Sequence, residues 1–191
     1  GQVLVNGTDV REYDSAALRQ KIGIVPQKAT LFAGTVRDNL LWGKREGVPA
    51  DDTALTEALD LAQAKSFIEE KEGGLDFVIE QNGRNLSGGQ RQRLTIARAL
   101  VRRPGVLILD DSASALDYAT DARLRQAIRR LEYRPTTFIV SQRTASLRHA
   151  DNILVLDDGE LVGLGTHDEL LENCSIYKEI YDTQFGGGDG K

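Results

Sequence analysis

The chain has 191 residues, of which 40% are hydrophobic and 28% are charged, and its formal net charge is −5 at pH 7. This length and composition are typical of one globular α/β domain with a sizeable core, and the acidic balance excludes a nonspecific nucleic-acid binder. A single cysteine excludes an internal disulfide, so Cys174 is interpreted as a small apolar core residue. No apolar run is long enough to span a bilayer, so any membrane role requires another domain or chain.

Both ends of the chain predict a piece of a longer polypeptide. The sequence contains no Met, and residues 3–5 already have a strand-like apolar pattern that leads into the turn dipeptide Asn6-Gly7. At the other end, residues 186–191 are rich in glycine, which predicts a flexible tail. We therefore expect a fold that is truncated at its N-terminus.

Helices and strands alternate along the first part of the chain. A short helix over 15–20 is followed by an apolar strand over 22–25, and residues 35–39 begin another helix after a loop. Asp52 or Thr53 can cap a longer helix whose apolar residues recur at helical spacing.

A second capped helix begins at Ser87. Ser87 and Gln90 have the spacing of a capping box, and apolar residues follow at helical spacing. The region 40–103 is therefore rich in helix and interrupts the strands, so we expect it to form a helical subdomain. Residues 1–39 and 104–185 then form the core that contains the sheet.

The alternation continues in the second half of the chain. Residues 106–109 form an uninterrupted apolar run, which predicts a strand of a parallel sheet that is covered on both faces. A helix over 120–131 and a strand over 136–140 follow. The remaining signals are a hairpin turn and a second capping box, at Asp158-Gly159 and at Thr166 with Glu169. This alternation predicts the α/β class.

The glycine-flanked serine is the first candidate for chemistry. Ser87 precedes Gly88 and Gly89 at a helix N-terminus, where free backbone N–H groups and the positive end of the helix dipole attract a phosphate. Glycines allow the backbone to approach such a group closely. Taken alone, this string is equally consistent with an ordinary capped helix.

A pair of carboxylates follows the apolar strand. In open α/β sheets, ligands bind at the carboxyl ends of the strands. Asp110 can hold Mg²⁺ there through water, and Asp111 can orient or deprotonate an attacking water. Taken alone, the pair could also be solvated acids at the end of a strand.

These features occur with the order and spacing of a known family. Residues 86–90 (Leu-Ser-Gly-Gly-Gln) resemble the signature sequence of ATP-binding cassette (ABC) proteins, and 106–110 resemble their Walker B strand. Gln27 is similar to the family's Q-loop glutamine, and residues 30–40 are similar to the segment that follows the Q-loop in exporter-type members. Residues 114–117 resemble the family's D-loop. The resemblance extends over 1–185.

The resemblance implies a P-loop NTPase-like (RecA-like) core with a mostly parallel sheet and an inserted helical subdomain. It also implies that ATP and Mg²⁺ bind, with Gln27 and Asp110 at the metal. In this family two such domains enclose two ATP molecules head to tail. The residues that would complete the ATP site of the second domain are those of the signature sequence: Ser87, Gly88, Gly89 and Gln90. Asp117, in the D-loop, would communicate between the two sites.

Several departures from the family pattern bear on activity. The P-loop and the aromatic residue that stacks on adenine are missing, and we expect them before Gly1. Asp111 occupies the position of the catalytic glutamate and is shorter by one methylene, and a misplacement of about 1 Å can lower a rate on the order of 100-fold. Gln142 occupies the position of the switch histidine and cannot titrate near neutral pH. Gln81 also stands where an acid is expected.

We therefore expect an ABC-type ATPase of an exporter at the cytoplasmic face of the cell membrane, in the manner of the degenerate-site subunit of a heterodimeric multidrug-type exporter. Its own slow site would be lined by Gln27, Asp110, Asp111 and Gln142. The partners implied are a second, non-identical nucleotide-binding domain and a transmembrane domain, with no nucleic acid. The fragment alone is expected to be inactive because it has no P-loop.

Three alternatives remain open at this point. One is the nucleotide-binding domain of a homodimeric exporter that tolerates Asp and Gln at these two positions. Another is a soluble ABC ATPase without a transport role, although the short spacing from Gln27 to Leu86 and the exporter-like segment argue against it. The third is a regulatory nucleotide-binding module that does not hydrolyse ATP.

Overall fold

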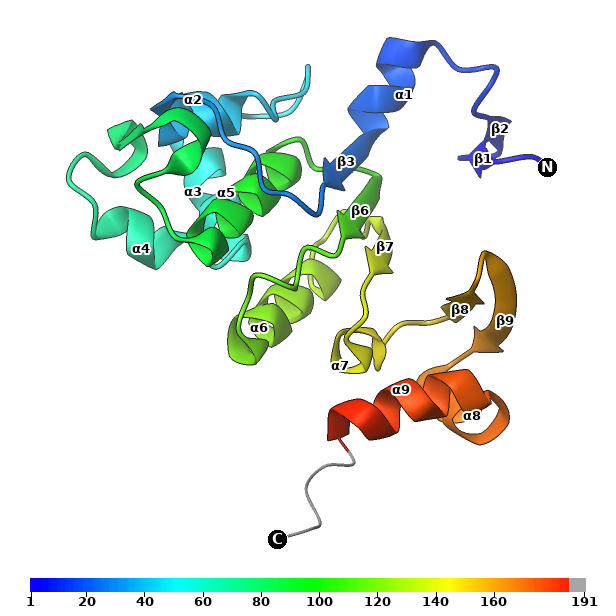
Figure 1. The fold of residues 1–191 in the computed structure, drawn as a ribbon. Coiled ribbons are helices and arrows are strands. Elements are labelled where there is room, and N and C mark those ends of the chain that lie inside the picture. Colours follow the sequence, from blue (N-terminus) through cyan, green and yellow to red (C-terminus); the bar gives the residue numbers. More distant parts are fainter. Residues whose placement is uncertain (186–191) are drawn as a thin grey trace, which may run out of the picture. The chain divides into compact units, whose positions relative to one another are not determined.

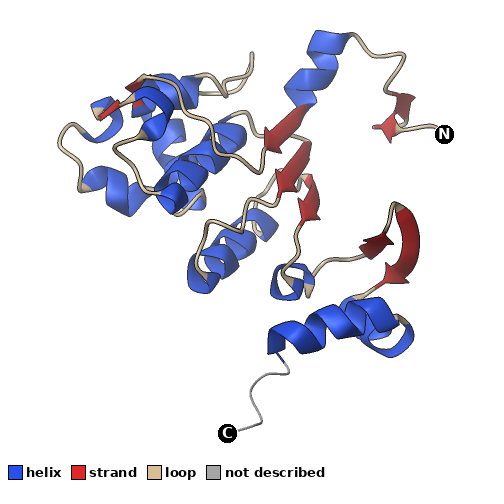
Figure 2. Ribbon diagram, viewed as in Figure 1, coloured by secondary structure: helices blue, strands red, loops and turns tan. Residues whose placement is uncertain are grey.

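The computed structural model describes residues 1–185 and divides into two compact units, Gly1–Val140 and a second that begins at Ser141 (Figure 1). Each unit has its own apolar core and contains both helices and strands (Figure 2). The tail predicted over 186–191 lies outside the described residues. Within 1–185, no helix has both the length and the hydrophobicity needed to cross a membrane.

A three-stranded parallel sheet forms the centre of the first unit. Its strands are β3 (Ile22–Val25), β6 (Val106–Asp110) and β7 (Thr136–Val140), in the order β3-β6-β7. The register pairs Ile22 with Val106 and Val106 with Thr136, so the three strands begin at the same edge of the sheet. This pairing of distant strands confirms the predicted α/β class with a parallel sheet.

The first unit also contains helices and two short antiparallel strand pairs. The helices are α1 (Ser15–Lys21), α2 (Val36–Leu41), α3 (Asp52–Leu61), α4 (Lys65–Glu69), α5 (Gly88–Val101) and α6 (Tyr118–Arg129), with single 3₁₀ turns η1 (Gly74–Asp76) and η2 (Gln81–Gly83). The antiparallel strand pairs are β1 (Leu4–Val5) with β2 (Thr8–Asp9), and β4 (Gly34–Thr35) with β5 (Val78–Ile79).

Helices α2, α3 and α4 gather around α5, in the region that the sequence predicts to be rich in helix (Figure 1). The division of the chain into compact units falls after Val140 and does not separate this region from the sheet. A distinct helical subdomain over 40–103 therefore remains a prediction.

Only one face of the parallel sheet is fully covered within the first unit. Leu107 and Leu109 are buried and belong to the same apolar cluster as α5 and α6. Ile24, Phe138 and Val140 are more than half exposed. In the central strand itself, Val106 and Ile108 are half-buried, so the predicted coverage on both faces is only partial within the first unit. Successive side chains of a strand point to opposite faces, and the elements of this unit leave the second face partly open.

Side-chain caps start the helices at or next to the predicted positions. The cap of α3 is Asp51, whose Oδ1 accepts a hydrogen bond from the Ala54 backbone N–H at 2.9 Å, so the prediction of Asp52 or Thr53 is wrong by one residue or two. Thr35 caps α2 and forms a capping box with Asp38 that the sequence analysis did not identify.

The second unit is a hairpin followed by two helices. Its elements are α7 (Thr144–Leu147), β8 (Ile153–Asp157), β9 (Glu160–Gly165), α8 (His167–Asn173) and α9 (Ser175–Phe185). The predicted hairpin turn is confirmed, with positive φ at Asp158 (45°) and Gly159 (82°). The capping box of Thr166 and Glu169 is present at the start of α8, and Cys174 is buried, as predicted.

Candidate functional site

The two predicted carboxylates lie at the carboxyl edge of the sheet. Asp110 is the last residue of β6, and Asp111 follows it with a φ of 43°, a conformation uncommon outside glycine. The backbone N–H of Asp111 donates to the Val140 carbonyl oxygen at 2.9 Å, and its own carbonyl accepts from the Ser114 hydroxyl at 2.8 Å. These two bonds fix the backbone of Asp111, and they therefore fix the position from which its side chain extends.

Gln27 meets Asp111 across the sheet edge. Gln27 follows β3, and its Nε2 donates to Asp111 Oδ2 at 3.3 Å, although the two residues are 84 positions apart. Hydrogen bonds to a carboxylate are usually about 2.7–2.9 Å long, so this contact is a weak one. The structure thus brings together two of the predicted site residues with a single long hydrogen bond.

The oxygen donors at this edge fit a magnesium ion. Asp110 is exposed, and Gln27 turns its amide nitrogen toward Asp111, which leaves its Oε1 available to a cation. Mg²⁺ is held in enzymes by one or two carboxylates together with waters and substrate phosphates. Among residues 1–185, no group of three or more His, Cys, Asp or Glu side chains could hold a metal by itself. A metal at this edge would therefore take its other ligands from phosphate and water.

The signature helix α5 begins as the sequence predicts. The Ser87 hydroxyl oxygen accepts from the Gln90 backbone N–H at 3.2 Å, and the Gln90 side-chain oxygen accepts from the Ser87 backbone N–H at 3.0 Å. This reciprocal pair is the predicted capping box. The backbone N–H groups of Gly88 and Gly89 lie in the first helical turn, where no intrahelical acceptor exists.

The two glycines of the signature sequence have different surroundings. A Cβ added at Gly89 would lie 3.1 Å from the Ala115 carbonyl oxygen, so this turn sits tightly against the D-loop. A Cβ added at Gly88 would meet nothing closer than an Arg91 side-chain nitrogen at 4.0 Å. Packing therefore explains a glycine at position 89, whereas Gly88 leaves room beside the helix N-terminus for a ligand.

Asp117 caps helix α6. Its carboxylate accepts from the Thr120 backbone N–H at 2.9 Å and from the Thr120 hydroxyl at 2.7 Å. These two hydrogen bonds lower the pKa of Asp117 below its ordinary value. The carboxylate is thus ionised at neutral pH and helps to start α6, while its role in communication between sites stays a prediction.

Gln142 belongs to the second unit. It lies between β7 and α7 with an exposed side chain, and its backbone carbonyl accepts from Gln184 Nε2 at 2.6 Å. This bond and those of Thr144 with Gln184 tie the segment to α9. Its role beside the strand-end carboxylates remains a prediction.

Sequence reasoning missed the arginines that anchor α5. Arg98 Nη2 donates to the Thr30 carbonyl oxygen at 2.9 Å, and its guanidinium lies 5.7 Å from the centre of the Phe32 ring. Phe32 in turn stacks on Trp42 at a ring distance of 4.6 Å. The signature helix is therefore tied to the segment that follows Gln27. The only signal in the sequence is an arginine-rich helix, which is also typical of a solvated surface.

Comparison with known proteins places these features in one family. The family model described as "ABC transporter" matches residues 1–114 of the chain. The chain is 46% identical over 186 residues to the uncharacterized ABC transporter ATP-binding protein YfiB of Bacillus subtilis (strain 168). It is 40% identical over 186 residues to the ATP-dependent lipid A-core flippase of Escherichia coli (strain K12). Each alignment covers 97% of this chain and 32% of the relative, so the chain spans about a third of the length of these proteins.

A solved structure gives the same result for the fold. A bacterial Atm1-family ABC exporter with ATP bound matches with a TM-score of 0.89 and 34% sequence identity, over 97% of this chain and 32% of that chain. The parallel sheet, the capped signature helix and the strand-end carboxylates therefore occur in a P-loop NTPase-like fold that is shared with an exporter. The chain belongs to the ABC transporter family, as an ATP-binding domain whose relatives are exporter ATP-binding proteins.

Proposed function

We propose that this chain is the ATP-binding part of a longer exporter subunit, which couples ATP binding and hydrolysis to movement of a substrate across a membrane. The observation that carries the proposal is the contact of Gln27 with Asp111, because it joins the Q-loop position to the strand-end carboxylates at one edge of the sheet. The relatives support it, since one is named a lipid A-core flippase and one neighbour is an exporter with ATP bound. The subunit would work at the cytoplasmic face of the cell membrane, with a transmembrane domain as partner.

The residues at the sheet edge divide the chemistry between them. Asp110 and the Gln27 amide oxygen would hold Mg²⁺, which when bound neutralises charge on the phosphates of ATP. Asp111 would orient the attacking water, but its reach is shorter than that of a glutamate. Gln142 would hydrogen-bond to the γ-phosphate without changing its own protonation. We propose that this combination makes a slow, degenerate site.

The signature helix serves a different site. In a head-to-tail pair of domains, the N-terminus of α5 would face the ATP held by a second domain. The open space at Gly88 and the free N–H groups of the first turn suit a phosphate there. The partner would be a non-identical nucleotide-binding domain with the faster site. The chain alone is proposed to be inactive, because its sequence contains no P-loop.

A comparison of two alanine variants tests this division in the assembled transporter. Ser87→Ala should lower the steady-state ATPase rate on the order of 100-fold, because it damages the fast site. Asp111→Ala should lower it less than about tenfold, because it damages a site that is already slow. Ser66→Ala, at an exposed position of α4, is the matched control and should leave the rate unchanged. Equal losses for Ser87→Ala and Asp111→Ala would overturn the asymmetry and favour a homodimeric exporter.

A further inference from the structure

We propose that the first unit contains a phosphate-binding site separate from the nucleotide site, in a small hollow at the opposite edge of the central sheet. The hollow has a volume of about 240 Å³, and the polar side chains that line it are those of Asn6, Lys21, Arg45, Arg103 and Tyr133. We call it the basic hollow. This inference does not depend on the proposed transport function.

The charges around the basic hollow favour an anion. Lys21, Arg45 and Arg103 line one space, and no acidic residue lines it. Within 1–185, neither Lys21 nor Arg45 forms an ion pair, and Arg103 meets Glu57 at 3.5 Å between two side chains that are about half exposed. Such an exposed pair neutralises little charge. Three cations around one small space repel one another unless an anion lies between them.

Tyr133 supplies an unused hydrogen-bond donor. Its hydroxyl oxygen is buried and has no hydrogen-bond partner in the described structure. Tyr133 lines the hollow, and buried polar atoms are nearly always paired, so the unpaired hydroxyl of this residue indicates a missing partner. Burial raises the pKa of Tyr133 to about 12, so the phenol keeps its proton at neutral pH and can donate to an oxyanion. A phosphate oxygen would accept this bond along with those from the cations.

The position of the basic hollow separates it from the strand-end carboxylates. Lys21 directly precedes β3, and Gly105 of the lining directly precedes β6. Asp110 ends β6 at the other edge, and the four steps from Val106 to Asp110 span roughly 13 Å of extended chain. The two sites therefore lie at opposite ends of the same strand. At about 240 Å³ the hollow is smaller than the roughly 300–1,000 Å³ of pockets for drug-sized ligands, so it suits a small group.

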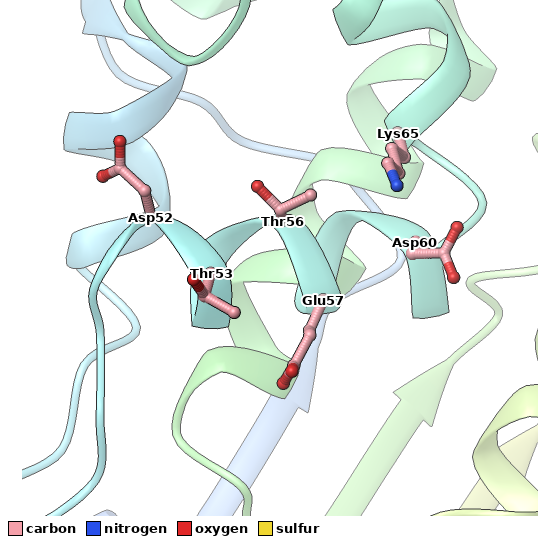
Figure 3. Close-up of a pocket in the computed structure, with 6 residues that line it drawn as sticks. All are labelled: Asp52, Thr53, Thr56, Glu57, Asp60 and Lys65. Atoms are coloured by element: carbon pink, nitrogen blue, oxygen red, sulfur yellow. The ribbon is translucent and has the colours of Figure 1, made fainter.

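A second, larger hollow shows the opposite character. It has a volume of about 390 Å³ and lies along α3, with polar and acidic side chains from that helix and Lys65 from α4 (Figure 3). Its acids are Asp52, Glu57 and Asp60, which disfavour an anion. Glu57 is also the residue that meets Arg103. Among residues 1–185, Glu57 of this larger hollow is the carboxylate that pairs with Arg103 and would compete with phosphate for it.

Calorimetric titration of the complete polypeptide that carries this chain tests the proposal. The nucleotide sites are first filled with Mg²⁺ and a non-hydrolysable ATP analogue, so that added phosphate can bind only elsewhere. Inorganic phosphate is the first probe and glycerol 3-phosphate is the second, which distinguishes the free ion from a phosphate monoester. Saturable binding of either probe is expected. Saturable binding of neither would overturn the proposal.

Four variants connect the binding to the basic hollow. Arg103→Gln should weaken binding about tenfold, as expected for one charge-assisted hydrogen bond. Tyr133→Phe should weaken it about fivefold without lowering the melting temperature of the phosphate-free protein, because the lost hydroxyl has no partner there. Glu57→Gln should tighten binding a few-fold by releasing Arg103. Arg148→Gln, at an exposed position of the second unit, is the control. Binding that Arg103→Gln and Tyr133→Phe leave unchanged would place the phosphate elsewhere and overturn the assignment.

Discussion

The signature helix and the strand-end carboxylates, to which we assign the two parts of the proposed ATP chemistry, are held in place by different contacts. The start of α5 has both cap hydrogen bonds, and Gly89 packs on the D-loop backbone. At the carboxylate side, two hydrogen bonds hold the backbone of Asp111, and its carboxylate accepts one long bond of 3.3 Å from Gln27. The helix is therefore positioned by the chain itself. The Asp111 carboxylate is positioned by its backbone turn and by the long contact with Gln27.

Arginine side chains that bond to backbone carbonyls explain most of this difference. Arg91 donates to the carbonyl oxygens of Gly83 and Leu86, at 3.3 and 3.2 Å. Near the end of α5, Arg102 donates to the Gly43 and Ile22 carbonyl oxygens, at 3.1 and 3.0 Å. Hydrogen bonds of this kind satisfy buried acceptors and fix a helix along its whole length.

The largest loss of stability should come from a substitution at Gly43, where α5 contacts the segment after α2. A Cβ at this position would collide with the Arg98 carbonyl oxygen, so the backbone must move. We expect Gly43→Ala to lower the free energy of unfolding by about 3 kcal/mol. Chemical denaturation of the complete polypeptide measures this loss. An unchanged midpoint for Gly43→Ala would show that α5 is not held as tightly as described.

Alanine substitutions at the two signature glycines should have different effects on stability. Gly88→Ala should change the free energy of unfolding by less than about 0.5 kcal/mol, because its Cβ enters open space. It should nevertheless lower the ATPase rate of the assembled transporter, since that space is proposed for a ligand. Gly89→Ala should lower both stability and rate. Denaturation and ATPase assays on both variants separate the two roles, and a clear loss of stability in Gly88→Ala would contradict the account.

Removal of the α5 cap should lower the free energy of unfolding more than removal of the contact between Gln27 and Asp111. Ser87→Ala loses a helix cap and should lower the free energy of unfolding by about 1 kcal/mol. Gln27→Ala removes an exposed side chain with one long hydrogen bond and should change it by less than about 0.5 kcal/mol. Parallel denaturation curves measure the two values. A larger loss for Gln27→Ala than for Ser87→Ala would mean that the carboxylate edge contributes more to stability than the helix cap.

The smallest expected effect is the pH dependence of stability that comes from Asp117 in the D-loop. Because the folded-state pKa of Asp117 is lowered, its contribution to stability is fully present above its unfolded value of about 3.9 and is lost as pH falls below it. Asp117→Asn should therefore reduce the loss of melting temperature on acidification. Thermal unfolding of wild type and variant at neutral pH and below pH 4 measures the difference. An identical pH dependence of the melting temperature in the two proteins would contradict a stabilising role for the ionised Asp117 cap.

Local signals in the sequence predicted the elements well. The capping boxes at Ser87 and Thr166, the strand at 136–140 and the turn at Asp158-Gly159 each depend on residues a few positions apart, and all are present. The α3 cap was misplaced because acids occupy both 51 and 52, and either can accept from the first-turn N–H groups.

Long-range contacts could not be predicted in the same way. The pairing of β4 with β5 joins residues 34–35 to 78–79, and neither pair carries a strand pattern of its own. The contact of Gln27 with Asp111 and the basic hollow likewise join segments that are distant in the chain. The family resemblance supplied the candidate site residues, whose roles stay predictions. The fold adds the contact between Gln27 and Asp111, which no local pattern contains.

The most direct test of the account is the steady-state ATPase rate of the complete subunit, purified alone. Wild type is compared with the double variant Asp111→Glu plus Gln142→His, which restores the family's residues at both positions. We predict a low rate in the wild type and a strong increase in the double variant. A high wild-type rate that the two changes leave unaltered would contradict the proposal of a degenerate site and favour a homodimeric exporter.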